Sequence, residues 1–464
     1  MRLKVLSQKQ LDQIHDATLA ILSKTGVELT LPSARELLQE HGATVSGKRV
    51  LFPPALVDKC LGLCPSVVRL QGRDPQRQIE LGSGDWFAHN VGGVPNVLEN
   101  DSRRPATRAD VISATRLLDA LPNVASITPH FTPQDVPTEQ MELWEFFDTV
   151  TNTTKPVRAP GTHSASHVRA MAEMADIAFP GSGRQGLTVG ISPISPLTFP
   201  DNIVEAMMET AHQKMILGPL PCPIMGATAP MSIVGAVTSQ NAEVLTSIIL
   251  AQLITPGLPI IYKGRLSLLN PRTALSIWGN PELGLISAIT TEVAHNYHLP
   301  VDVYGLSTNS HILDIQNGYE RVTSALLPVL AGADEISGVG EMDSGVNSSL
   351  AQMVLDDEIL SGVARLRRGV RVDEDALAVD LIDSVLNGPG NFLAEAHTVR
   401  FLRGGEMTIT ELADRTSWSE WEVAGRPTIV DRAETKVADL LADDTKTREP
   451  LSDQQLNEMQ SVIR

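Results

Sequence analysis

The regular alternation of short apolar runs with longer amphipathic segments is the feature that most constrains the fold of this chain. It begins near Asp85, and it is typical of successive βα units. Eight candidate strands can be read from the sequence: Trp86–Val91, Ser126–Thr132, Val157–Thr162, Leu187–Ser192, Met215–Leu220, Leu258–Tyr262, Val301–Leu306 and Glu335–Val339. Each precedes a predicted helix, namely Ala109–Leu121, Thr138–Thr149, Ser166–Ala178, Asn202–Gln213, Ala242–Leu253, Glu282–Tyr297, Tyr319–Leu330 and Leu350–Leu366.

Eight βα units of this length predict an α/β fold, closed into an eight-stranded parallel (βα)8 barrel of the TIM type. The alternative is a doubly wound open sheet, but no Gly-x-Gly-x-x-Gly turn opens the first helix. Residues 85–374 would form the barrel. Residues 1–84 are expected to form a helical N-terminal collar, and residues 375–464 a C-terminal extension that packs on the barrel.

The amino terminus is expected to be a helix rather than a secretion signal. Ser7 and Gln10 form a capping-box pattern, and Gly26 provides a stop signal after Lys24. No run approaches the roughly 20 apolar residues of a membrane span, so no membrane association is expected.

Charge and cysteine content exclude further classes of protein. A formal net charge of −18 and a pI near 5.0 argue against a nucleic-acid partner, which would require clustered Lys and Arg. The 3 cysteines lack zinc-finger spacing and imply no disulfide framework, so a cytoplasmic location is expected. The His and Cys residues are scattered, and no bound metal is expected.

Polar residues directly after the strands are the candidates for the site, because loops at the carboxyl ends of barrel strands surround the reaction centre. Many such groups only cap the next helix or bond loop backbone, so each has a purely structural alternative. This filter retains His89, Asn90, His130, Thr132, Ser192, Ser195, Lys263, Arg265, Ser307, Asn309, His311, Glu341 and Asp343.

A run of small residues after the fifth strand, from Gly226 to Ser232, leaves space for a broad ligand such as a flat macrocycle. Tight packing of the loop on its helix explains the same composition equally well.

Several segments, in order along nearly the whole chain, resemble the trimethylamine methyltransferase family. They are Leu19–Gly26, Arg73–Pro75, Arg104–Thr107 with Asp110, Gly226–Pro230, Asp314–Glu320, Asn391–Leu393 and His397–Thr398. The resemblance implies a barrel that removes a methyl group from an amine and transfers it to the cobalt(I) corrinoid of a separate protein.

The founding branch of that family uses pyrrolysine to demethylate tertiary amines. The resemblance places the special residue near Ser310 or His311, and this sequence has only standard residues there. A quaternary ammonium already leaves as a neutral amine, whereas a tertiary amine must first be activated. The resemblance therefore implies the larger branch that acts on quaternary amines, with glycine betaine as the favoured substrate.

The resemblance and the strand-end filter together assign roles to residues at the mouth of the barrel. Cation–π contacts and carboxylate anchors suit a betaine. The expected catalytic residues are His311, Asn309, Glu341 and Asp343. The expected substrate-binding residues are Tyr262, Lys263, Arg265, Tyr304, His89 and Phe131, and the expected contacts to the corrinoid are Gly226, Ala227 and Thr228.

Two other functions remain open at this stage. Lys263 follows the sixth strand, as the Schiff-base lysine does in aldolases of the same architecture, and borohydride trapping would reveal an imine. A non-catalytic betaine-binding protein would bind the ligand without methyl transfer. A corrinoid-binding protein is the expected partner because no corrinoid module is evident, and homo-oligomer formation is left open.

Overall fold

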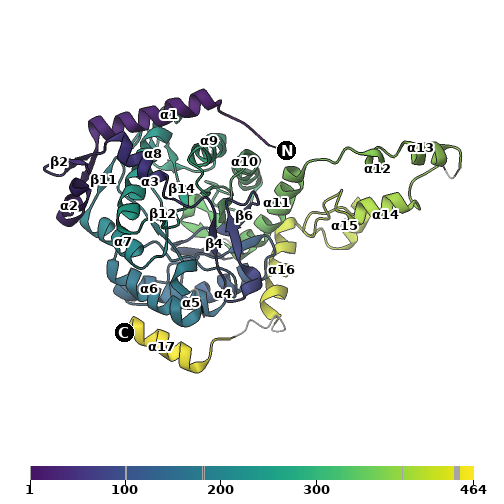
Figure 1. The fold of residues 1–464 in the computed structure, drawn as a ribbon. Coiled ribbons are helices and arrows are strands. Elements are labelled where there is room, and N and C mark those ends of the chain that lie inside the picture. Colours follow the sequence, from purple (N-terminus) through teal and green to yellow (C-terminus); the bar gives the residue numbers. More distant parts are fainter. Residues whose placement is uncertain (1, 100–101, 180, 182, 389, 444–449) are drawn as a thin grey trace.

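The structure, a computed structural model, describes residues 2–99, 102–179, 181, 183–388, 390–443 and 450–464. At its centre are parallel strands surrounded by helices (Figure 1). One sheet of five parallel strands has the order β14-β17-β18-β6-β9, and a two-stranded parallel sheet pairs β10 with β12. These strands are β6 (Phe87–Asn90), β9 (Val124–Ser126), β10 (Thr188–Ile191), β12 (Ile216–Pro219), β14 (Tyr262–Gly264), β17 (Val301–Tyr304) and β18 (Glu335–Val339).

Isolated parallel bridges link the two sheets. Ile127 pairs with Val157, Arg158 with Thr188, and Leu217 with Ile260. The expected strand over Val157–Thr162 is therefore reduced to these single bridges. Pro156 precedes the segment and Pro160 lies within it, and neither can donate to a ladder, which explains why no regular strand forms.

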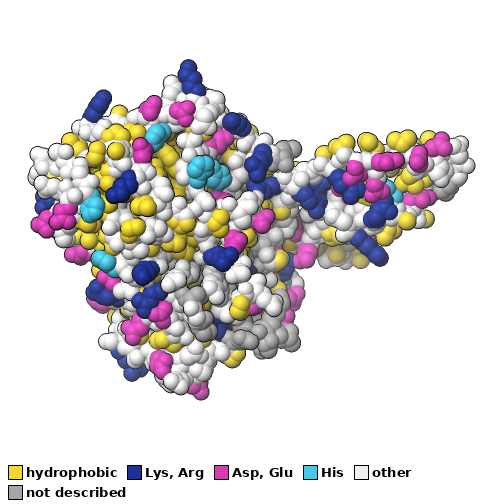
Figure 2. Space-filling model, viewed as in Figure 1, with side chains coloured by type: hydrophobic (Ala, Val, Ile, Leu, Met, Phe, Trp, Pro, Cys, Tyr) yellow, Lys and Arg dark blue, Asp and Glu magenta, His cyan; other side chains and the backbone are white. Residues whose placement is uncertain are grey.

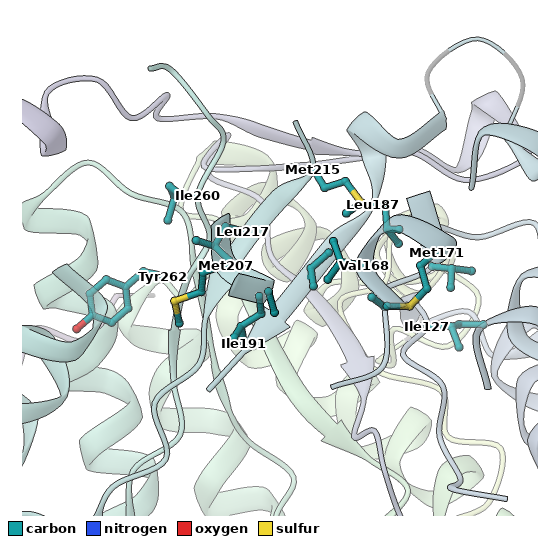
Figure 3. Packing of buried hydrophobic residues seen from close by; sticks show 14 of the residues in the cluster. Ile127, Val168, Met171, Leu187, Ile191, Met207, Met215, Leu217, Ile260 and Tyr262 are labelled. Atoms are coloured by element: carbon teal, nitrogen blue, oxygen red, sulfur yellow. The ribbon is translucent and has the colours of Figure 1, made fainter. Parts of the chain in front are cut away.

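A helix follows each of these eight parallel segments, as the alternation predicted. The helices are α4 (Arg108–Ala120), α5 (Met141–Thr151), α6 (Ala165–Ala178), α7 (Asp201–His212), α8 (Ile233–Ile254), α9 (Pro281–Asn296), α10 (Ile315–Ala331) and α11 (Leu350–Arg368). Buried apolar side chains fill the space between strands and helices, for example Ile191, Leu217 and Met207 (Figure 3).

Helix α8 is long and apolar enough to cross a membrane by length and composition, contrary to the expectation that no such run exists. In the structure, 83% of its most apolar window is buried inside the fold. Its apolar character is thus accounted for by packing as a core helix.

Short strands extend the loops at the carboxyl ends of the parallel strands. One small sheet contains β7 (Asn96–Glu99), β8 (Ser102–Pro105), β19 (Glu341–Met342) and β20 (Asn347–Ser348). Another contains β13 (Ile224–Met225), β15 (Ser267–Leu269) and β16 (Ser276–Ile277). These sheets fix the loops that carry most of the expected site residues.

The N-terminal region contains strands as well as the expected helices. Helix α1 (Gln8–Ala20) begins with the predicted capping box of Ser7 and Gln10. Gly26 ends the helical segment at a φ of +66°. The other elements are the π-helical turn η1 (Ile21–Thr25), β1 (Val27–Leu29), α2 (Pro32–Glu40), β2 (Thr44–Ser46), β3 (Arg49–Leu51), α3 (Pro54–Leu61), β4 (Val68–Leu70) and β5 (Ile79–Leu81).

Only part of the C-terminal segment packs on the central body. Helix α16 (Ile429–Ala442) lies against α11 and α4, and α17 (Asp453–Ile463) lies against α6. Between α11 and α16 an arm projects from the body and contains α12 (Glu374–Leu377), α13 (Val379–Leu386), α14 (Ala396–Arg403) and α15 (Trp418–Val423) (Figure 1). The segment between α14 and α15 contacts the body, because Glu358 of α11 accepts hydrogen bonds from the backbone N–H groups of Glu411, Leu412 and Ala413. The arm exposes many apolar side chains (Figure 2), including Val379, Leu386, Leu393, Trp418 and Val423.

Gly338 in β18 has a φ of +126°. A Cβ atom there would collide with the carbonyl oxygen of Gly305. We therefore expect Gly338→Ala to destabilise the fold by about 2–4 kcal/mol, because strain and a backbone clash add. As a control, Gly362→Ala in α11 meets no atom within 4 Å and should stabilise by roughly 0.5–1 kcal/mol. Chemical denaturation measures both; equal midpoints for the two variants would contradict the prediction.

Candidate functional site

The parallel strands carry a network of buried charges around Asp302 of β17. Its carboxylate oxygens lie 3.1 Å from Lys263 Nζ, 2.9 Å from Arg265 Nη2 and 3.2 Å from His89 Nε2. These three partners come from β14, the residue after it, and β6. Because Lys263 and Arg265 are buried, the Asp302 carboxylate is what stabilises their charges in the interior, whereas burial lowers the pKa of His89.

A second buried ion pair joins Arg158 to Glu335 beside this network. Burial lowers the pKa of Lys263 to about 8, while Asp302 opposes that shift. The Lys263 amine therefore remains largely protonated at neutral pH and forms an ion pair rather than a free nucleophile. Its side chain crosses Gly218 of β12, where a Cβ would lie 2.6 Å from Lys263 Cε.

A metal would have to compete with these ion pairs. One oxygen or nitrogen from each of His89, Asp302 and Glu335 lies within 4.8 Å of the others. Both carboxylates are already paired with Lys263, Arg265 or Arg158. The cluster therefore fits an internal charge network better than a metal site.

Nearer the mouth, Tyr304 is close to two flat groups, the Trp278 ring and the Arg265 guanidinium. Its ring centroid is 4.8 Å from that of Trp278 and 5.3 Å from Arg265 Cζ. Since Asp302 and Tyr304 are two residues apart on β17, they project to the same face of the strand. Tyr304 therefore lies one layer above the charge network.

Glu341, the first residue of β19, is fully buried beside Tyr304. Its Oε1 accepts a hydrogen bond from the Ser307 hydroxyl at 3.1 Å. Among the described residues its Oε2 accepts no hydrogen bond of regular geometry, although the Tyr304 hydroxyl interacts with this carboxyl group. Burial raises the pKa of the Glu341 carboxyl to about 7, with Tyr304 and Arg321 opposing the shift.

Asn309 connects three loops of the mouth. Its Oδ1 accepts hydrogen bonds from the backbone N–H groups of Trp278 and Gly279, both at 2.8 Å. Its Nδ2 donates to the Ser276 carbonyl at 3.2 Å and to the Ser344 hydroxyl at 2.6 Å. With its amide occupied in this way, Asn309 positions the loops; it was expected among the catalytic residues, and that role stays a prediction.

His311 and Asp343 lie together at the rim rather than in the buried charge network. His311 Nδ1 is 2.8 Å from Asp343 Oδ1, and the His311 side chain is 77% exposed. His311 lines a cavity of about 540 Å³, with Met342 and Ile312 among its walls. The four expected catalytic residues are thus divided between the rim and the buried layer.

Two of the expected substrate-binding residues face away from the interior. Tyr262 packs in the apolar core, with its hydroxyl 3.1 Å from Asn241 Oδ1 on α8 (Figure 3). It precedes the inward-facing Lys263, and successive side chains of a strand alternate between faces. Phe131 is fully buried and packs edge-on to His130. Neither side chain belongs to the network around Asp302.

The expected corrinoid contacts lie in a tight turn after β13. Gly226 has a φ of +86°, and the Thr228 hydroxyl accepts a hydrogen bond from the Ile224 N–H at 2.8 Å. Gly226 and Ala227 are exposed, so a partner protein could reach them.

Four residues that the structure brings into the interior were not among the site residues expected from the sequence: Arg158, Trp278, Asp302 and Glu335. Asp302 and Glu335 stand out as acidic residues within buried strands, and this signal could have been used. Trp278 follows β16 in an insertion between β14 and α9, which the alternation of strands and helices in the sequence does not predict.

Comparisons with known proteins bear on this geometry. A profile described as "Trimethylamine methyltransferase (MTTB)" matches residues 1–464. This chain belongs to the trimethylamine methyltransferase family. The assignment confirms the resemblance and makes the chain a relative of amine methyltransferases.

Members of the family that are named for different substrates are similarly related to this chain. Trimethylamine methyltransferase MttB of Desulfitobacterium hafniense is 30% identical, covering 98% of this chain and 92% of the relative. A glycine betaine methyltransferase of the same species is also 30% identical, covering 90% and 88%. The solved monomethylamine methyltransferase MtmB of Methanosarcina barkeri has a TM-score of 0.53 at 13% identity, covering 95% and 89%. That likeness supports the α/β-barrel fold type.

Proposed function

We propose that this protein is cytoplasmic and demethylates a small quaternary amine, with glycine betaine as the favoured substrate. The methyl group would pass to the cobalt(I) corrinoid of a separate partner protein. The observation that carries the proposal is the chemistry at Ser310 and His311, where the resemblance places the special residue of the founding branch.

Neither residue supplies a group that could activate a tertiary amine. The Ser310 hydroxyl donates hydrogen bonds to Asp314 Oδ1 and to the Ile312 carbonyl oxygen, both at 2.9 Å. The His311 imidazole faces solvent and pairs with Asp343. Neither is an electrophile, so a substrate that already carries its positive charge suits this site.

The protein's own task would then be orientation and exclusion of water. A quaternary ammonium leaves as a neutral amine when its methyl group is attacked in line. Holding the N–CH3 bond at the mouth, in a fixed direction, can account for a large share of the rate enhancement. Arg265, Tyr304 and Glu341 form the buried floor on which such a substrate would rest.

The proposed architecture is a closed barrel whose mouth is covered by the partner. We infer that the two parallel sheets and the bridges at residues 127, 157–158 and 260 complete an eight-stranded ring, since each segment pairs with a neighbour on both sides. The corrinoid partner would approach over the carboxyl ends of the strands, within reach of the turn at Gly226.

The substrate proposal is tested by methylation of free cobalt(I) cobalamin, followed by its visible spectrum. We expect methylation with glycine betaine or another small quaternary amine, and at least about 100-fold slower methylation with trimethylamine, because the neutral amine is a poor substrate without activation. Heat-denatured protein provides the blank. Robust turnover of trimethylamine with none of any quaternary amine would refute the proposal.

A further inference from the structure

Trp278, Tyr304 and Glu341 lie together although they come from different loops and strands. Tyr304 contacts the Trp278 ring and interacts with the Glu341 carboxyl group. We propose that these three side chains bind the trimethylammonium head of the substrate, and that Trp278 determines the preference for a quaternary cation. This inference rests on the proposed function and assigns a site within it.

The first reason for this assignment is the Oε2 atom of the buried Glu341 carboxylate. A buried carboxylate oxygen without a donor is costly, and native interiors rarely leave one unpaired. Among the residues that the structure describes, Glu341 Oε2 accepts no hydrogen bond of regular geometry, and the Tyr304 hydroxyl is the group that interacts with this carboxyl. A cation placed beside it would compensate the buried charge.

The chemistry of the cation gives the second argument. A fully methylated ammonium has no N–H group, so it cannot donate hydrogen bonds to a site that contains only hydrogen-bond acceptors. It is recognised instead by aromatic faces and a nearby negative charge. Trp278 and Tyr304 supply the aromatic surface, and Glu341 supplies the charge.

Arg265 adds a preference for a zwitterion. Its guanidinium lies 5.3 Å from the Tyr304 ring and is held by Asp302. A substrate beside Tyr304 would therefore be near both a carboxylate, that of Glu341, and a guanidinium, that of Arg265. A betaine, with an ammonium and a carboxylate one carbon apart, matches this pair of charges.

Asn309 keeps Trp278 in place as a positioning residue. Its amide oxygen binds the backbone N–H groups of Trp278 and Gly279. The aromatic wall is thus fixed before a ligand arrives, and preorganised groups bind more tightly because less entropy is lost.

The test compares glycine betaine with 3,3-dimethylbutanoate, its uncharged-head carbon analogue, by titration calorimetry of the full chain. The wild type should bind betaine at least about tenfold more tightly. Trp278→Leu should reduce that ratio by about tenfold, whereas Trp278→Phe, which keeps an aromatic face, should change it less than about threefold. Trp418→Leu, at a 69% exposed position on the arm, is the matched control and should change nothing.

The outcomes separate this site from the proposed function. If Trp278→Leu keeps the wild-type ratio, or the wild type does not distinguish the two ligands, the site is overturned. If that happens while the wild type still methylates cobalamin from betaine, the function stands and only the site is wrong. If the wild type neither binds nor demethylates any quaternary amine, both proposals fall.

Discussion

Replacing Glu341 with glutamine is expected to lower kcat/KM for the quaternary amine by about 30-fold, equivalent to roughly 2 kcal/mol for a charge pair in a partly desolvated site. Glutamine keeps the size of the side chain and can still accept the Ser307 hydrogen bond. The loss should therefore fall on substrate binding and leave the fold intact. Steady-state cobalamin methylation and a thermal melt measure the two effects.

The same residue should impose a pH dependence. Burial raises the pKa of Glu341 to about 7, so its carboxylate fraction increases as the pH rises through that value. For the wild type, kcat/KM should consequently rise by up to about tenfold between pH 6 and pH 8. The rise should disappear in Glu341→Gln and persist in Glu40→Gln, an exposed control on α2. An identical profile in all three proteins would exclude Glu341 as the titrating group.

Asp302→Ala is expected to cause the largest loss of stability, about 3–5 kcal/mol. The substitution removes the carboxylate that pairs with Lys263, Arg265 and His89, all of them buried. Two cations would then remain in the interior without their shared partner. Urea denaturation monitored by circular dichroism gives the change in the free energy of unfolding.

Two further variants isolate the cause of that loss. Asp302→Ala combined with Lys263→Met should be more stable than Asp302→Ala alone, because one unpaired buried charge is removed. Asp375→Ala breaks ion pairs with Arg371 and Arg400 on the exposed arm and should leave the unfolding midpoint unchanged. If the double variant were the less stable one, lost packing rather than an unpaired charge would explain the effect.

Local sequence patterns predicted most of the central elements. β18 was expected at Glu335–Val339 and lies there, and α11 begins at the expected Leu350. Apolar periodicity and capping residues act within a few residues of each other, so the sequence displays them directly. The strand expected at Val157–Thr162 is reduced to single bridges because two prolines lack the N–H groups that a regular ladder needs.

Strands that pair over long distances were not predictable in this way. In the N-terminal region, β1 pairs in parallel with β11 (Thr198–Phe199), about 170 residues away in the sequence. A strand of 3 residues is too short to show an alternating pattern, so its existence depends on the partner that it meets in the folded chain.

The sequence by itself determined the family, the βα order and which polar residues follow the strands. Only the tertiary structure decided which of them share a site. Lys263 faces inward and Tyr262 outward because strand register sets the face of each side chain. The Asn309 amide is held by hydrogen bonds to two other loops, and the His311 side chain lies at the exposed rim. Trp278 meets Tyr304 through an inserted loop, a contact set by the three-dimensional path of the chain and by no spacing along it.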